Sequence, residues 1–393
     1  MENKINYDAV CPHDEFCGGC TYQGVPYEEQ LKTKENEVRS LLRQAMIEPD
    51  RFDPIEGCPE SSRYAYRNKM EYTFGDMVKG GELCLGMHRV RNFMSIVTVD
   101  HCQIVPPDFN RILRFTLDFC LKRGYVKYHK KRHDGLLRNL IVRRGVNTGE
   151  ILIDLVTTSE SEFDEEAWKD GLLALSLDGE IVGILHTIDD SIADAVISDE
   201  TRQLYGRDHY FEEIDGLRFK VHMFSFFQTN VEAAARLYEQ ALSLIDDFEG
   251  KTVFDLYCGT GTISQIAATR AKQVYGVELV PESVDSAREN ARLNGLDNCE
   301  FLCGDVFKVL EQFDGRPDVI TVDPPRVGIP PDAVKKIASY GVPQIVYISC
   351  NPKSLAKNLA EFKSLGYRTT YLKPFDNFPF TKGIEDVTLL TRT

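Results

Sequence analysis

Apolar residues repeat in two different ways along this chain. Between about residues 61 and 215, strand-like runs alternate with turns, and helical stretches are few; the runs are Met70–Phe74, Leu140–Val142, Glu150–Val156 and Ile181–Thr187. This pattern predicts a mixed, mostly antiparallel domain. Further on, a helix expected over Gln228–Ile245 is followed by strands and helices in alternation, which predicts a doubly wound α/β sheet.

The doubly wound part contains these expected strands: Val253–Leu256, Val274–Val277, Phe301–Leu302, Val319–Val322, Ile345–Ile348, Thr369–Leu372 and Asp386–Leu390. Another helix is expected over Tyr27–Gln44, after a group of cysteines. We therefore predict three parts: an N-terminal cysteine segment with a helix (1–60), a central mixed α+β domain (61–215), and the doubly wound domain (216–393).

Composition narrows the possible partners. The 393 residues carry a net charge of −15, which argues against a general polyanion-binding protein, so any nucleic-acid surface must be local. No apolar run approaches the length of a membrane span, and the first seven residues lack a signal-peptide core. We therefore expect a cytoplasmic protein.

Cysteines suggest a metal site near the N-terminus. The chain has 11 cysteines and no secretion signal, which favours free thiols or metal ligands over disulfides. Cys11, Cys17 and Cys20 lie close together in the sequence, and the Gly18-Gly19 pair permits a tight turn between the last two. Cys102 is the candidate for a fourth ligand. Four thiolates suit either structural zinc or a [4Fe–4S] cluster, and the spacing alone does not choose between them.

Two short motifs follow β-branched runs near the C-terminus. Asp323-Pro324-Pro325-Arg326 follows one expected strand, and Ser349-Cys350-Asn351-Pro352 follows the next. Because strand ends of an open α/β sheet point into the ligand crevice, a thiol and a carboxylate are expected in one site. Cys350 is the candidate nucleophile, which needs a polar setting to become a thiolate; the alternative is an inert core cysteine.

Glycines after the first strand of this sheet indicate a cofactor loop. The run from Tyr257 through Gly259 and Gly261 fits both S-adenosylmethionine and dinucleotide binders, and Glu278 at the next strand end could accept hydrogen bonds from ribose in either class. The motif that begins at Asp323 favours S-adenosylmethionine, because methyltransferases place a substrate-facing loop there. Asp305 either reads the adenine amino group or caps a helix.

Together these motifs resemble the RNA 5-methyluridine (uracil-C5) methyltransferase family, in its iron–sulfur-bearing branch. The resemblance extends over nearly the whole chain. It includes the N-terminal cysteines, Tyr66-Arg67-Asn68-Lys69, Ser225-Phe226-Phe227-Gln228-Thr229-Asn230, the Gly259 loop, the Asp323 and Cys350 motifs, and Glu385. It implies a Rossmann-like class I methyltransferase domain at the C-terminus.

The resemblance also implies roles for individual residues. Gln228, Tyr257, Glu278 and Asp323 would contact S-adenosylmethionine, Cys350 would be the nucleophile and Glu385 the base. Cys11, Cys17, Cys20 and Cys102 would hold a [4Fe–4S] cluster, which favours iron over zinc. Two departures stand out: relatives often have a β-barrel RNA-binding domain, whereas only ten residues precede Cys11, and relatives often carry histidines just before the glutamate.

The chemistry of such an enzyme explains these residue types. Attack of a thiolate on carbon 6 of uracil activates carbon 5 for methylation, and a base then removes the carbon-5 proton. Glu385 suits that step, although a solvated residue at a strand edge is the alternative. The target base must leave its stack to reach the thiol.

A basic stretch with few acids is the expected RNA surface. It contains Lys122, Arg123, Lys127, Lys130, Lys131, Arg132, Arg138, Arg143 and Arg144, with tyrosines interleaved. A weaker patch consists of Arg63, Arg67 and Lys69. The alternative for the stretch is a solvated run of charge.

We therefore expect an RNA (uracil-5-)-methyltransferase that acts as a monomer, with 23S ribosomal RNA favoured over transfer RNA as its partner. Two rival functions remain. One is an RNA cytosine-5 methyltransferase, which uses the same thiolate attack. The other is an iron–sulfur RNA-binding protein whose methyltransferase fold is vestigial.

Overall fold

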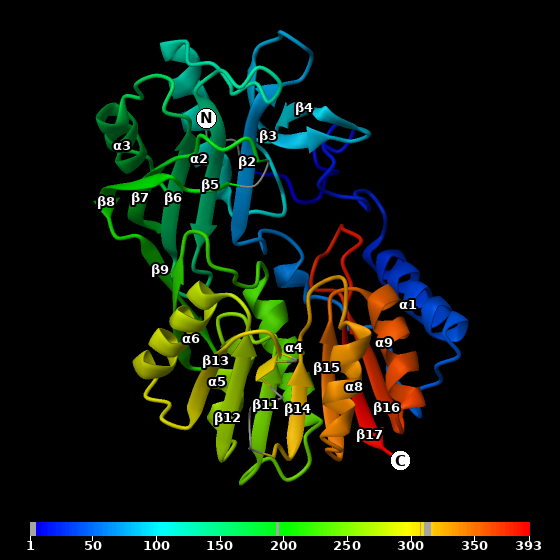
Figure 1. Ribbon diagram of the computed structural model, residues 1–393. Coiled ribbons are helices and arrows are strands. Elements are labelled where there is room, and N and C mark those ends of the chain that lie inside the picture. The colour runs from blue at the N-terminus through cyan, green and yellow to red at the C-terminus, as the bar shows by residue number, and fades with distance from the viewer. Residues whose placement is uncertain (1–4, 194–195, 307, 310–315) are drawn as a thin grey trace. The chain divides into compact units, whose positions relative to one another are not determined.

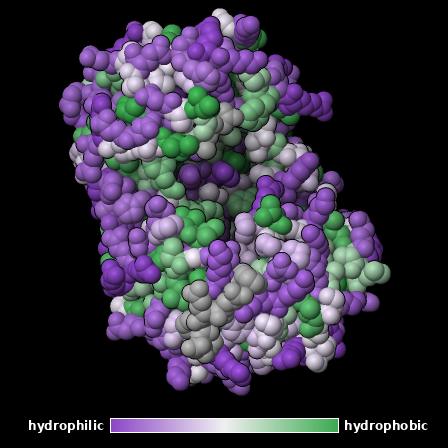
Figure 2. Space-filling model, viewed as in Figure 1, coloured by the Kyte–Doolittle hydropathy of each residue, from purple (hydrophilic) through white to green (hydrophobic). Residues whose placement is uncertain are grey.

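A computed structural model describes residues 5–193, 196–306, 308–309 and 316–393. The chain forms two compact units (Figure 1). The central unit consists of Met1–Gly24, Ser61–Glu213 and Val221–Phe224; the C-terminal unit consists of Val25–Glu60, Ile214–Lys220 and Ser225–Thr393. Among the described residues, no helix has both the length and the apolar character needed to cross a bilayer. Figure 2 shows a largely hydrophilic face with scattered apolar residues.

The C-terminal unit contains an eight-stranded sheet in the described residues, in the order β1-β16-β17-β15-β14-β11-β12-β13. Its strands are β1 (Arg51–Phe52), β11 (Thr252–Leu256), β12 (Gln273–Glu278), β13 (Cys299–Cys303), β14 (Val319–Val322), β15 (Gln344–Ser349), β16 (Tyr367–Phe375) and β17 (Glu385–Arg392). Neighbours pair in parallel except that β17 runs antiparallel to both β15 and β16. The alternating pattern of the sequence therefore produces the doubly wound sheet that it predicts.

Helices cover this sheet. They are α1 (Tyr27–Gln44), α4 (Val231–Ser243), α5 (Thr262–Ala268), α6 (Pro281–Leu293), α8 (Pro331–Ser339) and α9 (Pro352–Ser364). α1 and α8 pack against α9, whereas α6 packs against β12 and β13. The buried apolar core continues from β11, β14 and β15 into α8 and α9.

The N-terminal helix belongs to the C-terminal unit, which differs from the predicted 1–60 segment. α1 buries Val38 and Leu42 in the same core as Phe362 of α9. On the same stripe, the buried Lys34 ammonium lies 2.6 Å from the Asp376 carboxylate. The lysine is neutralised by an acid that is far away in the sequence. The apolar pattern of the helix alone therefore does not reveal where the helix packs.

The central unit is built on a seven-stranded sheet in the described residues, in the order β4-β3-β2-β5-β6-β7-β8. Its strands are β2 (Lys69–Asp76), β3 (Leu83–Arg89), β4 (Asn92–Thr98), β5 (Leu137–Arg144), β6 (Glu150–Thr157), β7 (Glu180–Ile188) and β8 (Glu200–Gly206). All neighbours are antiparallel except β6 and β7. With α2 (Pro107–Arg123) and α3 (Glu165–Leu173), this is the mixed, mostly antiparallel architecture expected.

Short elements complete the described chain. A 3₁₀ turn covers Glu60–Ser62, and β9 (His209–Ile214) pairs with β10 (Leu217–His222) in a hairpin. Asp215 and Gly216 at its turn both have positive φ, 51° and 77°. An Asp-Gly pair suits such a two-residue turn, because glycine accepts this conformation without strain.

Candidate functional site

Strand register brings the two candidate catalytic residues together. Ser349 of β15 pairs with Asp386 of β17 on the last rung of their antiparallel ladder. One step further, Cys350 follows Ser349 and Glu385 precedes Asp386. Asp323 follows Val322 of β14, which pairs in parallel with Tyr347 of β15. The thiol and both carboxyl groups therefore lie at one edge of the sheet.

The surroundings of Cys350 keep it protonated at rest. Burial raises the pKa of the thiol to about 11, the negative charges of Glu385 and Asp323 add to this, and the Arg326 guanidinium opposes it. Asn351 caps α9 by accepting the Lys353 N–H at 3.1 Å, and Pro352 occupies the first helical turn. The thiol thus lies beside a helix N-terminus, where the helix dipole favours the thiolate.

Glu385 is a buried carboxyl group close to other charged side chains. Burial together with the charges of Asp323 and Asp386 holds its pKa well above the usual range, while Arg326 opposes the shift. Burial also raises the pKa of Asp323 to about 7, with a contribution from Asp255. Such a group can exchange a proton with a reacting base near neutral pH.

The glycine loop after β11 leaves room for a ligand. Gly259 has φ of 56°, and a Cβ there would meet no atom within 4 Å, whereas a Cβ on Gly261 would lie 2.6 Å from the Phe301 ring. The loop is therefore packed on one side and open on the other. Glu278 supports it, since its carboxylate accepts the Gly259 N–H at 3.1 Å and the Leu279 N–H at 2.8 Å.

The other candidate cofactor residues lie in the same unit. Tyr257 adopts φ of 65°, a strained conformation for a residue with a side chain. Asp305 lies near enough to raise the pKa of the Tyr257 hydroxyl to about 12, after the larger effect of burial. Asp305 also accepts the Lys308 N–H at 3.2 Å, which is the helix-capping contact considered from the sequence. Gln228 hydrogen-bonds the Tyr238 hydroxyl of α4.

The four candidate metal-binding cysteines approach one another in the central unit. Burial raises the pKa of the Cys102 thiol to about 12, and the charges of Cys20, Cys11 and Cys17 raise it further. Backbone N–H groups hydrogen-bond three of the four sulfurs. The Gly19 N–H donates to Cys17 at 3.4 Å, the Ile104 N–H to Cys102, and the His13 and Gln103 N–H groups to Cys11. Donors of this kind stabilise thiolates that ligate a metal.

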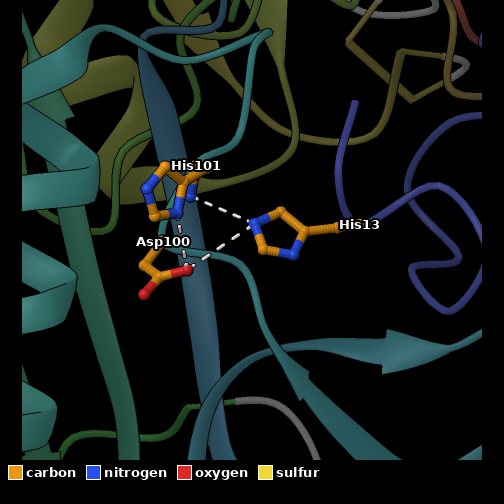
Figure 3. A group of neighbouring side chains, drawn as sticks. All are labelled: His13, Asp100 and His101. Carbon is orange, nitrogen blue, oxygen red and sulfur yellow. Dashed lines mark hydrogen bonds and ion pairs between the residues drawn. The ribbon is translucent and has the colours of Figure 1, made fainter. Parts of the chain in front are cut away.

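A histidine–aspartate network, which sequence reasoning did not identify, joins the two cysteine-bearing segments (Figure 3). His13 Nε2 accepts the His101 backbone N–H at 3.1 Å and lies 3.7 Å from Asp100 Oδ1, while Arg114 donates to the other Asp100 oxygen at 3.1 Å. The side chains of His13, Asp100 and His101 have ligand atoms within 4.8 Å of one another, close enough for a metal ion. Because the His13 nitrogen and the carboxylate already have protein partners, we interpret the group as a structural link. The signal in the sequence is a histidine close to Cys11 and another beside Cys102.

The basic stretch is divided between the surface and the interior. Lys130, Lys131 and Arg132 are exposed in a tight loop closed by the His129 N–H, which donates to the Asp134 carbonyl at 2.7 Å. Arg132 is paired with Asp134, and three other basic residues of the stretch also form ion pairs: Arg123 with Asp164, Lys127 with Asp76, and Arg144 with Asp108. The stretch is therefore not one continuous cationic face.

Two arginines of the stretch point inward. Arg138 is buried and donates to the carbonyls of Asp189, Ser191 and Ala193, which gives it a structural role. Arg143 is buried as well and donates to two carbonyls at the end of β10. The second expected patch, Arg63, Arg67 and Lys69, is partly buried; burial lowers the pKa of Lys69, and the charge of Arg143 lowers it further.

Comparisons with known proteins agree with this arrangement. Residues 247–372 match a family model described as a methyltransferase domain. An uncharacterized RNA methyltransferase of Clostridium acetobutylicum is 48% identical over 382 residues, 97% of this chain and 83% of the relative. A second from Clostridium tetani is 46% identical, over 98% of this chain and 84% of the relative.

Among solved structures, the Pyrococcus abyssi tRNA (uracil-54, C5)-methyltransferase in complex with S-adenosyl-L-homocysteine matches with a TM-score of 0.78 and 26% identity. The match covers 95% of this chain and 85% of that protein. It extends through both units and is not confined to the doubly wound sheet.

Proposed function

The chain belongs to the RNA methyltransferases, a family of S-adenosylmethionine-dependent enzymes, and we propose that it methylates carbon 5 of a uridine through a covalent adduct on Cys350. The observation that carries this proposal is the meeting of Cys350 and Glu385 at adjacent strand ends. A thiol and a carboxyl group on either side of one base provide both the nucleophile and the proton acceptor that the reaction requires. The likeness to a uracil-C5 methyltransferase supports the choice of base.

The proposed reaction begins when Cys350 gives its proton to solvent water and becomes a thiolate. The thiolate adds to carbon 6 of uracil, and the electron pair of the 5,6 double bond moves to carbon 5 and its neighbouring carbonyl. Carbon 5 then takes the methyl group that the sulfonium of S-adenosylmethionine supplies, leaving S-adenosylhomocysteine. Glu385, as carboxylate, removes the carbon-5 proton, the double bond forms again, and Cys350 leaves as thiolate.

Five residues are proposed to contact S-adenosylmethionine: Gln228, Tyr257, Glu278, Asp305 and Asp323. The open side of the Gly259 loop is the support for this assignment, since a backbone without a Cβ permits close approach of a ligand. The Glu278 carboxylate accepts three backbone N–H groups, from Gly259, Leu279 and Val280, which leaves one lone pair on Oε2 for a ribose hydroxyl.

We also propose that Cys11, Cys17, Cys20 and Cys102 hold a [4Fe–4S] cluster with a structural role. Their hydrogen-bond donors suit thiolate ligands. The choice of iron over zinc comes from the family resemblance, because four thiolates suit either metal site.

The proposed substrate is 23S ribosomal RNA, with transfer RNA as the second candidate because the Pyrococcus abyssi protein is named for transfer RNA. We propose that the enzyme acts as a monomer in the cytoplasm, where both RNAs occur. Mapping 5-methyluridine in total RNA from cells with and without this gene decides between ribosomal and transfer RNA as the substrate. Methylated cytidine in place of uridine would instead support a cytosine-5 methyltransferase.

Substitution of Glu385 tests the covalent mechanism. Glu385→Gln should methylate once and then stall, because the amide cannot accept the carbon-5 proton, and a protein–RNA adduct should survive denaturing gels. Glu249→Gln, at an exposed glutamate of the same unit, should turn over normally. Full turnover by Glu385→Gln without adduct would remove Glu385 from the mechanism.

A further inference from the structure

An exposed aromatic pair lies at the end of the β3–β4 hairpin in the central unit. The Phe93 ring stacks on the His88 imidazole with centroids 3.9 Å apart and planes 9° from parallel. Phe93 is nevertheless 64% exposed, and its neighbours Met94 and Val90 are 67% and 42% exposed. Single exposed apolar residues are ordinary, but three around one hairpin turn with a stacked ring pair indicate an interaction site.

The geometry of the hairpin fixes this pair. His88 Nδ1 lies 2.7 Å from the Phe93 carbonyl oxygen, so the imidazole donates to it and cannot rotate freely. Val90 and Arg91 form the turn between Arg89 and Asn92, which pair across the two strands. An aromatic surface that is already rigid loses little entropy when a flat ligand stacks on it.

One lysine lies close to the exposed ring, and further basic residues are exposed on the same loop and at the hairpin turn. The Lys130 ammonium lies 5.8 Å from the centroid of Phe93, and Lys131 and Arg132 are exposed in the same loop. Arg91 is exposed at the hairpin turn. Sites that bind single-stranded nucleic acid combine an aromatic face for the base with cations for the phosphates, and this hairpin and the neighbouring loop offer both.

The cysteine-bearing loop packs against the same hairpin. The Gly18 N–H donates to the His88 carbonyl at 3.0 Å, and the Val90 N–H donates to the Phe16 carbonyl at 2.8 Å. The backbone of Cys17 pairs with that of Arg89 in an isolated antiparallel β-bridge. The loop that carries three of the four proposed cluster ligands therefore holds the hairpin in place. Figure 1 shows the hairpin at the edge of the sheet, with the N-terminal segment beside it.

We propose that Phe93, backed by His88, is a stacking platform for an unpaired base of the RNA substrate, with Lys130 facing the adjoining phosphates. The proposal rests on the proposed function, because it takes RNA as the partner, and it adds a site for a base other than the one that is methylated. One stacked base commonly accounts for about a 5- to 100-fold change in affinity when its aromatic partner is removed.

Tryptophan at position 93 provides a direct test. Trp168 is the only tryptophan of the chain and is fully buried, so Phe93→Trp adds one exposed indole to a constant background. Titration with a single-stranded oligouridylate of about 20 nucleotides should quench the added fluorescence, whereas duplex RNA of equal length should not. Equal quenching by both RNAs, or none by either, would overturn the platform.

Phe93→Ala measures the contribution of stacking. It should weaken binding of the same oligonucleotide by about 5- to 100-fold, with iron content, melting temperature and S-adenosylmethionine affinity unchanged. Tyr205→Ala is the matched control, since Tyr205 is a 41% exposed aromatic residue on β8, at the opposite edge of the same sheet. Unaltered RNA affinity in Phe93→Ala would overturn the proposal.

These outcomes separate the platform from the enzyme activity. If the wild-type protein makes 5-methyluridine but Phe93→Ala binds RNA normally, only the platform fails. If RNA quenches the fluorescence of the Phe93→Trp variant but the wild-type protein makes no 5-methyluridine, only the proposed function fails. Sedimentation of the wild-type protein as a dimer that Phe93→Ala dissociates would assign the patch to a second copy of the chain and overturn its role in RNA binding.

Discussion

Cys350 and Cys102 are both thiols whose pKa is raised by burial, but different groups lie next to them. Burial raises the pKa of Cys350 to about 11 and that of Cys102 to about 12. The neighbours of Cys350 are two carboxyl groups and a guanidinium, whereas the neighbours of Cys102 are three other thiols. A proton leaving Cys350 can be exchanged with nearby acids, but protons leaving four adjacent thiols require a cation to replace them. The groups next to each sulfur, more than the pKa of its thiol, therefore indicate whether it acts as a nucleophile or as a metal ligand.

The two sites are also assembled differently. Cys350, Glu385 and Asp323 are placed by the register of adjoining strands, so each position follows from counting residues along a ladder. The four other cysteines come from loops that are held by a histidine–aspartate network and by bonds to the β3–β4 hairpin. We therefore expect substitutions at the Cys350 site to lower the reaction rate, and substitutions of the four other cysteines to lower the stability of the fold.

The largest effect should follow removal of the Cys350 thiol. Cys350→Ala should lower the rate of methyl transfer by ~10³-fold or more, since no other group of the site can form the adduct. S-adenosylmethionine affinity, measured by calorimetry, and the melting temperature should be unchanged. Cys303→Ser, at an exposed thiol of the same unit, is the control. More than a few per cent of wild-type turnover in Cys350→Ala would contradict the nucleophile assignment.

Substitution of the other thiols should act on stability. The anaerobically purified protein should contain about four irons per chain. Cys102→Ser and Cys17→Ser should each lose most of this iron and lower the free energy of unfolding by ~3 kcal/mol or more, because the cluster ties separate segments together. Cys84→Ser, on β3 of the same unit, should keep both values. Stoichiometric zinc without iron would refute the assignment of the cluster.

How far the sequence predicts these features depends on where their partners lie. The strands and the two C-terminal motifs are predictable, because alternation and strand ends are local properties of the chain. The packing of α1 is not, since Lys34 becomes a core residue only through Asp376, 342 residues away. The RNA surface is the clearest case: Arg138 and Lys130 look alike in the sequence, yet carbonyls more than 50 residues away draw Arg138 inside.

A smaller effect should follow reversal of the charges that remain exposed. The triple substitution of Lys130, Lys131 and Arg132 to glutamate should weaken RNA binding by ~10- to 100-fold at low salt and reduce the slope of log affinity against log salt by about one unit per lost phosphate contact. Lys79→Glu, at an exposed position of the same unit, is the control for a single charge reversal outside the loop. Unchanged affinity would leave the loop as a solvated surface and direct attention to Arg63, Arg67 and Lys69.

The smallest effect concerns the charge that opposes both pKa shifts at the catalytic site. The Arg326 guanidinium lowers the pKa of Cys350 and of Glu385, both of which burial raises. The reaction needs the thiolate and the carboxylate, so kcat/KM should rise with pH on the alkaline side of neutrality. Arg326→Gln raises both pKa values further, which should move this rise by roughly one pH unit to higher pH and lower the neutral rate by ~10-fold.

Single-turnover rates from about pH 6 to about pH 10 measure this shift, and Arg326→Lys should restore part of it because the positive charge returns. The backbone should remain in place in either variant, since Asn351 and Ser354 bind the carbonyl of residue 326 and not its side chain. Lys353→Gln, which removes a charge from the first turn of α9, is the control. A uniform fall in rate at every pH would mean that Arg326 holds the substrate instead. The two thiol sites would then differ in their neighbours, but the charge beside Cys350 would not set its acidity.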